Sequence, residues 1–455
     1  MFDNRDNIDF AGGNIGKLFA GIFFPTLLGM LFNMAFLLTD GIFVGHGIGK
    51  HGLASINLIG PIMMLINGLG MMLGMGASVV AAIHLSHGNI KAARINVTQA
   101  FGAGIGVSVL MGTFCYLFPD TVLGLLGVKG DLYASTREYY LWFLPTCLLL
   151  MIETLGLFVI RLDGSPRYAM LSNIVAAVVN GVMDYILIFP CHLGVKGAAL
   201  ATDIGGLVGT LMVAYYMLFR TRTLHLYRLK HTWTSLRLTL RNVGYMARVG
   251  VPGLVGEAAV AVMMLTGNLA FMRHIGDDGV AAYSIACYLF PLVYMICTAV
   301  AQSAQPIISY NYGAGAHKRV DHAVGFSMAV SAAVGLVVSL FFLLFSPQMA
   351  LCFLNPDVTA YGIAAEGLPY YGAGFLFMAV NICAVGYLQS IERSGTATLF
   401  TLLRGVVFLV AAYTVLPSTI GDKGLWLSVP CAELLTSVTV IVYVIAVSVR
   451  NRRNR

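Results

Sequence analysis

Long apolar runs constrain this chain more than any other feature of its sequence. Twelve predominantly apolar segments reach or exceed about 20 residues, the length that an α-helix needs to cross the hydrocarbon core of a bilayer. They lie at about 16–43, 53–82, 95–118, 134–160, 167–189, 196–219, 244–271, 280–308, 320–345, 358–390, 396–416 and 424–448. None alternates polar with apolar residues as a membrane barrel strand would. The sequence therefore predicts an all-α polytopic membrane protein with about twelve transmembrane helices.

Composition supports this fold class and excludes others. Hydrophobic residues make up 58% of the chain and charged residues 10%, whereas soluble proteins carry about 25% charged residues. The net charge of +7 comes from bases in short loops and in the tail, a pattern that indicates membrane topology and not nucleic-acid binding. Eight scattered cysteines never form a Cys-x-x-Cys motif, so we expect neither a disulfide framework nor a metal site.

The two halves of the chain are related by a constant offset of 227 residues. The matching positions are Pro25 with Pro252, Gly49–Ala54 with Gly276–Ala281, Gly88–Lys91 with Gly315–Lys318, and Gly194–Gly197 with Gly421–Gly424. Because each half has an even number of spans, both copies insert the same way up. The sequence therefore predicts two parallel six-helix repeats, an architecture typical of alternating-access transporters.

A basic segment without a single acidic residue separates the repeats. We expect a six-helix N-lobe at 1–219, a basic cytoplasmic linker at 220–243, and a six-helix C-lobe with a basic tail at 244–455. Most loop Lys and Arg residues fall on the linker's side of the membrane. The few on the opposite side are Lys50, Lys129, Arg137, Lys196, Arg273 and Lys423. The charge bias predicts a multi-pass protein of the inner (plasma) membrane with both termini in the cytoplasm.

Several acidic residues lie inside the predicted spans. They are Asp40, Glu153, Asp184 and Glu257, with Asp203 and Glu433 nearer to span ends, and Arg404 is the one base well inside a span. An acidic side chain at membrane depth costs about 2.5–3.5 kcal/mol on insertion scales, so it marks an ion or proton site more often than a contact that merely holds two helices together. The chain has no phosphate loop, because Gly45–Lys50 is followed by His51, and we therefore expect transport driven by an ion gradient.

The segment 173–189 combines an apolar span with a polar stripe. Asn173, Asn180 and Asp184 are seven and four residues apart, which places them on one face of a helix. Two carboxylates that converge in a low-dielectric cavity cannot both stay ionised without a cation, so such a site binds H+ or Na+. Pro25 and Pro252 lie inside spans, where each removes a backbone hydrogen bond and favours a bend.

Several motifs together resemble the multidrug and toxic compound extrusion (MATE) family over nearly the whole chain. They are Asp40-Gly-Ile-Phe-Val-Gly45, Asn173-x6-Asn180-x3-Asp184, Gly194-x2-Gly197-Ala198-Ala-x-Ala-Thr202, Pro252-x4-Glu257 and Gln302-x2-Gln305-Pro306. The stretch from Gln305 to Tyr312 resembles the MepA-like bacterial branch of this family in particular.

The resemblance implies two six-helix lobes around a central cleft and the exchange of Na+ or H+ for lipophilic, often cationic compounds. The family's N-lobe cation site falls on Asp40, Asn180, Asp184 and Thr202, which are therefore candidates for cation or proton coupling and for Na+ binding. In the C-lobe, Glu257 matches the family's glutamate, but the tenth span, where the family has an aspartate, contains none, and its only comparable polar residue is Asn381. This departure shifts the expected coupling site to the N-lobe. Glu257, Asn381, Gln302 and Gln305 remain candidates for the substrate cleft.

We interpret the chain as a monomeric antiporter, not an enzyme, that exports amphipathic cationic drugs or metabolites and needs no cofactor beyond its coupling ion. A lipid-linked saccharide flippase is the main alternative, but it requires a basic cavity, and Arg404 is the one deep base. A membrane enzyme lacks support because His46, His51, His84 and His87 lie in short loops. A channel is disfavoured because no selectivity-filter segment or fourfold repeat is present.

Overall fold

The computed structural model describes residues 8–453 except residues 129, 131 and 231, without the side chains of residues 36, 37, 50, 51, 53 and 447–453. The basic side chains of the predicted C-terminal tail, from Arg450 onward, lie outside the described part. Every regular element in the described part is a helix.

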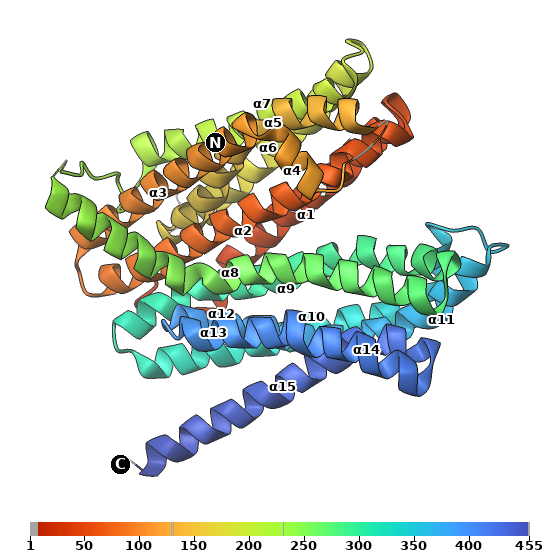
Figure 1. The fold of residues 1–455 in the computed structure, drawn as a ribbon. Helices are drawn as coiled ribbons and strands as arrows, with labels where there is room; N and C mark the ends of the chain where they lie inside the picture. The colour runs from red at the N-terminus through yellow and green to blue at the C-terminus, as the bar shows by residue number, and fades with distance from the viewer. Residues whose placement is uncertain (1–7, 129, 131, 231, 454–455) are drawn as a thin grey trace. The chain divides into compact units, whose positions relative to one another are not determined.

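The first repeat comprises α1 (Ile15–Gly47), α2 (Lys50–Ser86), α3 (Ile90–Leu117), α4 (Pro119–Leu125), α5 (Leu132–Leu162), α6 (Pro166–Ile188) and α7 (Gly194–Tyr215), which continues as the π-helical turn η1 (Tyr216–Arg220) (Figure 1). The second repeat comprises α8 (Trp233–His274), α9 (Asp277–Gly313), α10 (His317–Leu351), α11 (Thr359–Gly372), α12 (Phe375–Ser390), α13 (Ser394–Leu402), the π-helical turn η2 (Leu403–Val407), α14 (Phe408–Ile420) and α15 (Asp422–Arg453).

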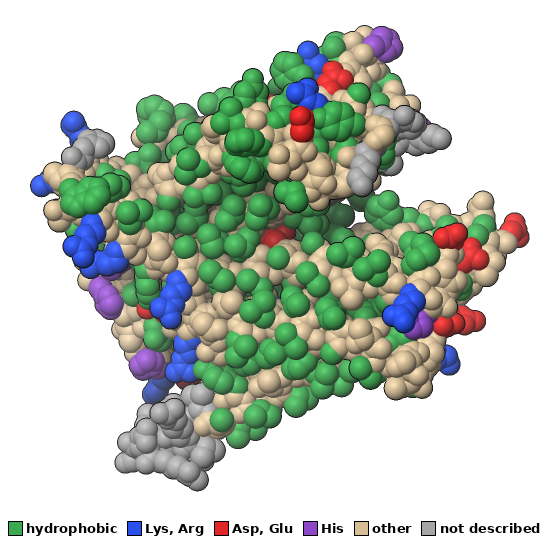
Figure 2. All heavy atoms as spheres, viewed as in Figure 1, with side chains coloured by type: hydrophobic (Ala, Val, Ile, Leu, Met, Phe, Trp, Pro, Cys, Tyr) green, Lys and Arg blue, Asp and Glu red, His purple; other side chains and the backbone are tan. Residues whose placement is uncertain are grey.

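The number and surface of the helices confirm the predicted fold class. Eleven helices of the described part are long and apolar enough to cross a membrane, and α11 with α12, bent by 43° at a short break, makes a twelfth span. Large hydrophobic side chains such as Leu110 and Phe219 are about three-quarters exposed. On the face shown in Figure 2, hydrophobic side chains cover the sides of the helices, and Lys and Arg gather near helix ends. Soluble monomers rarely expose such extended apolar surface, whereas a lipid bilayer covers it.

The helix boundaries reproduce the offset of 227 residues found in the sequence. The starts of α2 and α9, of α3 and α10, and of α5 and α11 are each separated by this offset. Three pairs of glycines related by it have similar positive φ angles: Gly49 and Gly276 (88° and 89°), Gly88 and Gly315 (71° and 69°), and Gly194 and Gly421 (58° and 67°). Glycine adopts this conformation without the penalty that a Cβ imposes. The two repeats therefore share one fold and one residue register.

The described residues divide into two compact units, one formed by those up to Glu257 with Ser309–His317 and the other by Ala258–Ile308 with those from Lys318 onward. The division passes through α8 and α9. In the first unit, α6 packs against α1 and α7, and α5 packs against α2 and α7. Glu257 is grouped with this unit. The predicted lobe boundaries at 219 and 244 remain a prediction.

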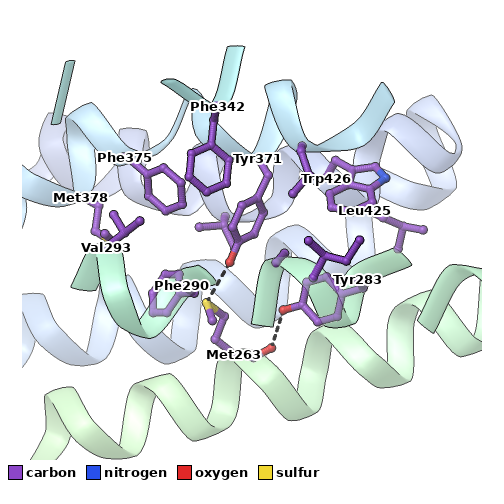
Figure 3. Close-up of a cluster of buried hydrophobic side chains, with 14 of the residues drawn as sticks. Met263, Tyr283, Phe290, Val293, Phe342, Tyr371, Phe375, Met378, Leu425 and Trp426 are labelled. Carbon is purple, nitrogen blue, oxygen red and sulfur yellow. Dashed lines mark hydrogen bonds between the residues drawn. The ribbon is translucent and has the colours of Figure 1, made fainter. Parts of the chain in front are cut away.

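A cluster of buried side chains rich in aromatic rings, among them Tyr283, Tyr371 and Trp426, forms an aromatic core in the second unit (Figure 3). The rings of Phe271 and Tyr283 stack with centroids 4.6 Å apart, and the edge of Trp426 meets Phe271 at 4.9 Å. The Tyr371 hydroxyl donates a hydrogen bond to the Met263 sulfur (3.7 Å). Such pairs add about 0.5–1.5 kcal/mol each beyond the burial of their area, which favours a rigid interior.

The segment after η1 is fastened to the first unit by one carboxylate. Asp163, which is buried, accepts hydrogen bonds from the backbone amides of Arg222 (2.8 Å), Thr223 (2.9 Å) and Leu224 (3.0 Å) and from the Tyr216 hydroxyl (2.8 Å). Beyond it, α8 already begins at Trp233, so the second half of the predicted linker is helical.

We expect Asp163→Ala to destabilise the protein. Each buried donor left unsatisfied costs about 1–3 kcal/mol, and this substitution removes the acceptor of three backbone amides, whereas the Tyr216 hydroxyl keeps its hydrogen bond to Ser165. The thermal unfolding midpoint in detergent should fall by several degrees, whereas Asp321→Ala, at an exposed position of α10, should leave it unchanged. Equal midpoints for the two variants would mean that Asp163 does not hold this segment.

Candidate functional site

Three helices of the first unit bring the predicted coupling residues together. Asp40 lies in α1, Asn180 and Asp184 in α6, and Thr202 in α7. The close approach of α7 to α6 depends on Gly205, because a Cβ at this position would lie 2.6 Å from the Cβ of Asn180. A larger residue would force the two helices apart and move the polar groups that they carry.

The two aspartates are close to each other and poorly satisfied by the protein. Asp184 is fully buried and Asp40 is partly buried. Their carboxyl groups face each other closely enough to interact directly. Among the described residues, no donor forms a well-aligned hydrogen bond with either oxygen of Asp184 or with Oδ1 of Asp40. Burying a carboxylate without such compensation is unfavourable, so this pair requires a proton or a cation.

A cavity of about 180 Å³ lies beside Asp40. Its walls come from five helices of the first unit and combine apolar side chains with acidic, amide and hydroxyl groups. The lining residues are Asn33, Asp40, Ile56, Met63, Tyr139, Thr146, Leu150, Glu153, Ala176, Ala177, Asn180, Thr202, Gly205 and Gly206. The Nδ2 atom of Asn180 has no hydrogen-bond partner in the described part of the chain. The cavity therefore offers unused polar groups and no basic side chain.

Helix α5 contributes polar groups that the sequence analysis left out of the site. The buried Tyr139 side chain lines the cavity together with Thr202 and Asp40, and its hydroxyl lies close to Thr202 and to both aspartates. Two helical turns further along α5, the Thr146 hydroxyl donates a hydrogen bond to the Asp203 carboxylate (2.5 Å). Tyr139, Thr146 and Glu153 are spaced seven residues apart, so they share one helix face. This heptad spacing inside an apolar span is the signal that could have identified them.

Glu153 is a further carboxylate in the cavity wall. It was recognised as an acid within a span but was not placed in the site. Its side chain is buried and lies against Gly209, where an added Cβ would lie 2.5 Å from the carboxylate carbon. The absence of a side chain at Gly209 therefore makes room for the Glu153 carboxyl group between α5 and α7.

The four residues predicted for the substrate cleft are divided between the two units. Glu257 belongs to the first unit, where its side chain lies close to the Asn67 side chain of α2. Asn381, Gln302 and Gln305 are buried in the second unit, where Asn381 donates to the Glu433 carboxylate (2.8 Å). A cleft that contains all four remains a prediction.

The predicted bend residues Pro25 and Pro252 lie within α1 and α8, and both helices continue past them. Their contribution to a bend therefore also remains a prediction. In the described part of the chain, no group of three or more His, Cys, Asp or Glu side chains is arranged to hold a metal ion.

Comparison with known proteins decides the family. Residues 25–186 and residues 252–414 each match the MatE family model, so the model matches both repeats. The chain belongs to the MatE family. Membership confirms the resemblance seen in the motifs and makes this MATE protein a transporter and not an enzyme.

Relatives of this MATE transporter cover nearly its whole length. It is 24% identical over 432 residues to the multidrug export protein MepA of Staphylococcus aureus (strain MRSA252), covering 92% of this chain and 91% of the relative. It is also 24% identical over 452 residues to an FAD transporter of Shewanella oneidensis, covering 95% of each chain.

Solved structures show the same fold. One is an outward-facing conformation of a multidrug resistance MATE family transporter (TM-score 0.87, 22% identity, 95% of each chain covered). Another is a MOP superfamily transporter from Pyrococcus furiosus (TM-score 0.86, 21% identity, 95% of each chain covered).

Proposed function

We propose that this MATE transporter is a secondary antiporter that exports amphipathic, cationic organic molecules in exchange for Na+ or H+. The observation that carries the proposal is the buried Asp40–Asp184 pair. In the described part of the chain, no donor bonds either oxygen of Asp184 or Oδ1 of Asp40, and Asp40 lines a cavity without a basic side chain. Asp40, Asn180, Asp184 and Thr202 would hold the coupling cation or proton.

The size of the cavity supports an ion as its occupant. Sites for drug-sized ligands measure about 300–1,000 Å³, whereas this cavity measures about 180 Å³. It has room for a partly hydrated cation and too little room for a drug. Carboxylate, amide and hydroxyl oxygens are the ligands that hard cations prefer. When no cation is bound, one proton shared by the two aspartates would remove their mutual repulsion.

The substrate class follows from the charges that the chain can offer. The relatives include a multidrug exporter and an FAD transporter, and FAD carries an anionic pyrophosphate. A pyrophosphate, whether of FAD or of a lipid-linked saccharide, requires basic groups in its binding site. Arg404 is buried and bound to Glu433, which leaves it unavailable for an anion. We therefore favour organic cations, with Glu257, Asn381, Gln302 and Gln305 as candidate contacts in the substrate cleft.

Efflux from vesicles tests the proposal. Purified protein in liposomes loaded with a fluorescent organic cation should export it when an inward Na+ gradient or pH gradient is imposed, and the gradient that drives export identifies the coupling ion. Liposomes loaded with FAD provide the competing arm. Export of FAD without export of the cation would overturn the proposed substrate class.

Two native cysteines allow a test of the proposed topology, in which both termini are cytoplasmic. Cys191, between α6 and α7, and Cys352, after α10, are the exposed ones among the eight cysteines. With a cytoplasmic N-terminus, both loops face outward. A membrane-impermeant maleimide should label both in intact cells, and Cys191→Ser with Cys352→Ser should abolish the signal. In that background, Arg228→Cys in the linker should react only after permeabilisation. Labelling of Arg228→Cys in intact cells, without labelling of Cys191 and Cys352, would show that the topology is the inverse of the one proposed.

A further inference from the structure

A buried ion pair lies in the second unit, outside the proposed coupling site. The Arg404 guanidinium, in the π-helical turn η2, contacts the Glu433 carboxylate of α15 with Nε and Oε1 2.8 Å apart. Both side chains are more than nine-tenths buried. A charged pair so far from water persists only when its geometry is good and its remaining hydrogen-bonding groups are satisfied.

The surroundings of this pair meet that condition. Asn381 donates to Oε2 of Glu433 (2.8 Å), and Ser437 donates to the Asn381 oxygen (2.9 Å). The Arg404 guanidinium also lies over the ring of Tyr294, 5.8 Å from its centroid. Glu433 therefore has a permanent cation and a second hydrogen-bond donor, whereas among the described residues neither is bonded to Asp184 in the first unit.

The repeat register relates this ion pair to the cavity of the first unit. At the offset of 227 residues, Arg404 corresponds to Ala177 and Glu433 corresponds to Gly206, and both Ala177 and Gly206 line the cavity. A shift of one residue, such as a π-helical turn introduces, would pair Arg404 with Ala176, which also lines the cavity. The two charged side chains of the second repeat thus occupy positions whose counterparts in the first repeat line the cavity.

The correspondence also holds in the opposite direction. Asp40 and Asp184 correspond to Gly267 and Ala411, so the second repeat lacks both coupling aspartates. Other cavity-lining positions carry larger side chains in the second repeat. Ile56 and Met63 correspond to Tyr283 and Phe290, which belong to the aromatic core (Figure 3).

We infer that Arg404 is a built-in cation that takes, in the second repeat, the place of the exchangeable cation of the first. The inference rests on the proposed coupling function of Asp40 and Asp184. Because the guanidinium cannot leave, Glu433 takes no part in ion exchange, and each transport cycle uses one coupling site. Removal of the Arg404 charge would then expose a latent site for a proton or a monovalent cation at Glu433.

The groups that surround Glu433 allow a clean test. The titratable side chains that act on it from the packed helices are Arg404 of η2, Cys297 of α9 and Tyr371 of α11. Arg404 is the one that carries a positive charge. Its replacement therefore leaves Glu433 with neutral donors only, of which Asn381 is the nearest.

The experiment uses Arg404→Met in an Asp40→Asn/Asp184→Asn background, in which the coupling site of the first repeat can no longer respond to ions. Thermal unfolding midpoints of the full-length protein in detergent are measured from pH 5 to pH 9, with and without NaCl. Without its partner, buried Glu433 is tolerated when protonated or when a cation binds. The midpoint of Arg404→Met should therefore fall by about 5 °C or more as the pH rises, relative to Arg404→Met/Glu433→Gln, and Na+ should restore part of the loss. The unfolding midpoint of Arg404→Lys, which keeps the positive charge, should change little with pH or NaCl.

Each outcome decides the inference. If Arg404→Met cannot be produced while Arg404→Met/Glu433→Gln can, the defect follows the uncompensated charge and supports it. Superimposable pH profiles of these two variants would overturn it. In the otherwise wild-type chain, Arg404→Met/Glu433→Gln should retain export within about twofold of wild type, and loss of export would show that the pair does more than balance charge. The coupling proposal itself is tested separately, by Asp184→Asn in the wild-type chain.

Discussion

Asp184→Asn should reduce gradient-driven export by about 100-fold or more, to the level of liposomes without protein. Asn has nearly the same size as Asp and keeps one carbonyl oxygen, but it neither ionises nor carries a proton. The buried pair with Asp40 then loses its capacity to bind a coupling cation, while the packing of α6 changes little. Export of a fluorescent organic cation under the effective gradient measures the loss.

Companion variants separate a coupling defect from a folding defect. Asp184→Asn should insert and unfold at a midpoint close to or above that of wild type, because it removes a buried carboxylate to which no described residue donates a hydrogen bond. Asp40→Asn should be equally inactive, and the double variant should be no worse than either single variant, because residues that form one site act non-additively. Glu257→Gln should impair export less. A folded Asp184→Asn protein that still exports under a gradient would refute the assignment.

The sequence predicted the helices and the repeat because both depend on local patterns. Apolar runs of membrane length define spans whatever their neighbours are, and the matching of Gly49 with Gly276 records a backbone conformation that both copies use. Asn180 and Asp184 were recognised because four-residue spacing places them on one helix face. Their position opposite Asp40 followed from the family resemblance, since no periodicity within α6 reports what lies on α1.

The sequence could not predict contacts between distant helices. Glu433 was placed near a span end, but it is buried within α15, and its bond to Arg404 joins residues on two different elements. A tyrosine in an apolar span is usually a packing residue, so residue type alone does not single out Tyr139. Its contact with Thr202 depends on how α5 packs against α7. In each case the missing information was tertiary, and helix periodicity does not contain it.

The two repeats therefore share one backbone fold but differ in how the charges of their buried acidic groups are compensated. In the first repeat, no donor among the described residues bonds the Asp184 carboxylate, and small residues such as Ala177 and Gly206 border a cavity. The second fills the corresponding positions with Arg404 and Glu433, which neutralise each other. An acidic group that has a fixed counter-ion is stable in every conformation. An acidic group that lacks one makes the stability of its repeat depend on ion binding. A transport cycle driven by an ion gradient needs an acidic group without a fixed counter-ion.

Ala177→Arg should transfer the fixed cation to the first repeat and abolish gradient-driven export. Ala177 lines the cavity and precedes Asp184 by seven residues on α6, so a side chain added there starts on the same helix face as the aspartate. The guanidinium would compensate the aspartates permanently, and the cavity of about 180 Å³ has room for it. The protein should fold, lose export to the level of Asp184→Asn, and unfold at a midpoint that no longer responds to Na+.

Ala177→Met is the matched control for this substitution, because it adds a side chain of similar length without a charge. It should retain measurable export, since the aspartates can still bind and release a cation or proton in the space that remains. If Ala177→Met is as inactive as Ala177→Arg, obstruction of the cavity explains the loss and the charge does not. If Ala177→Arg exports at the wild-type rate, exchange of a cation at Asp40 and Asp184 is not what drives transport, because a fixed positive charge beside them would have ended it.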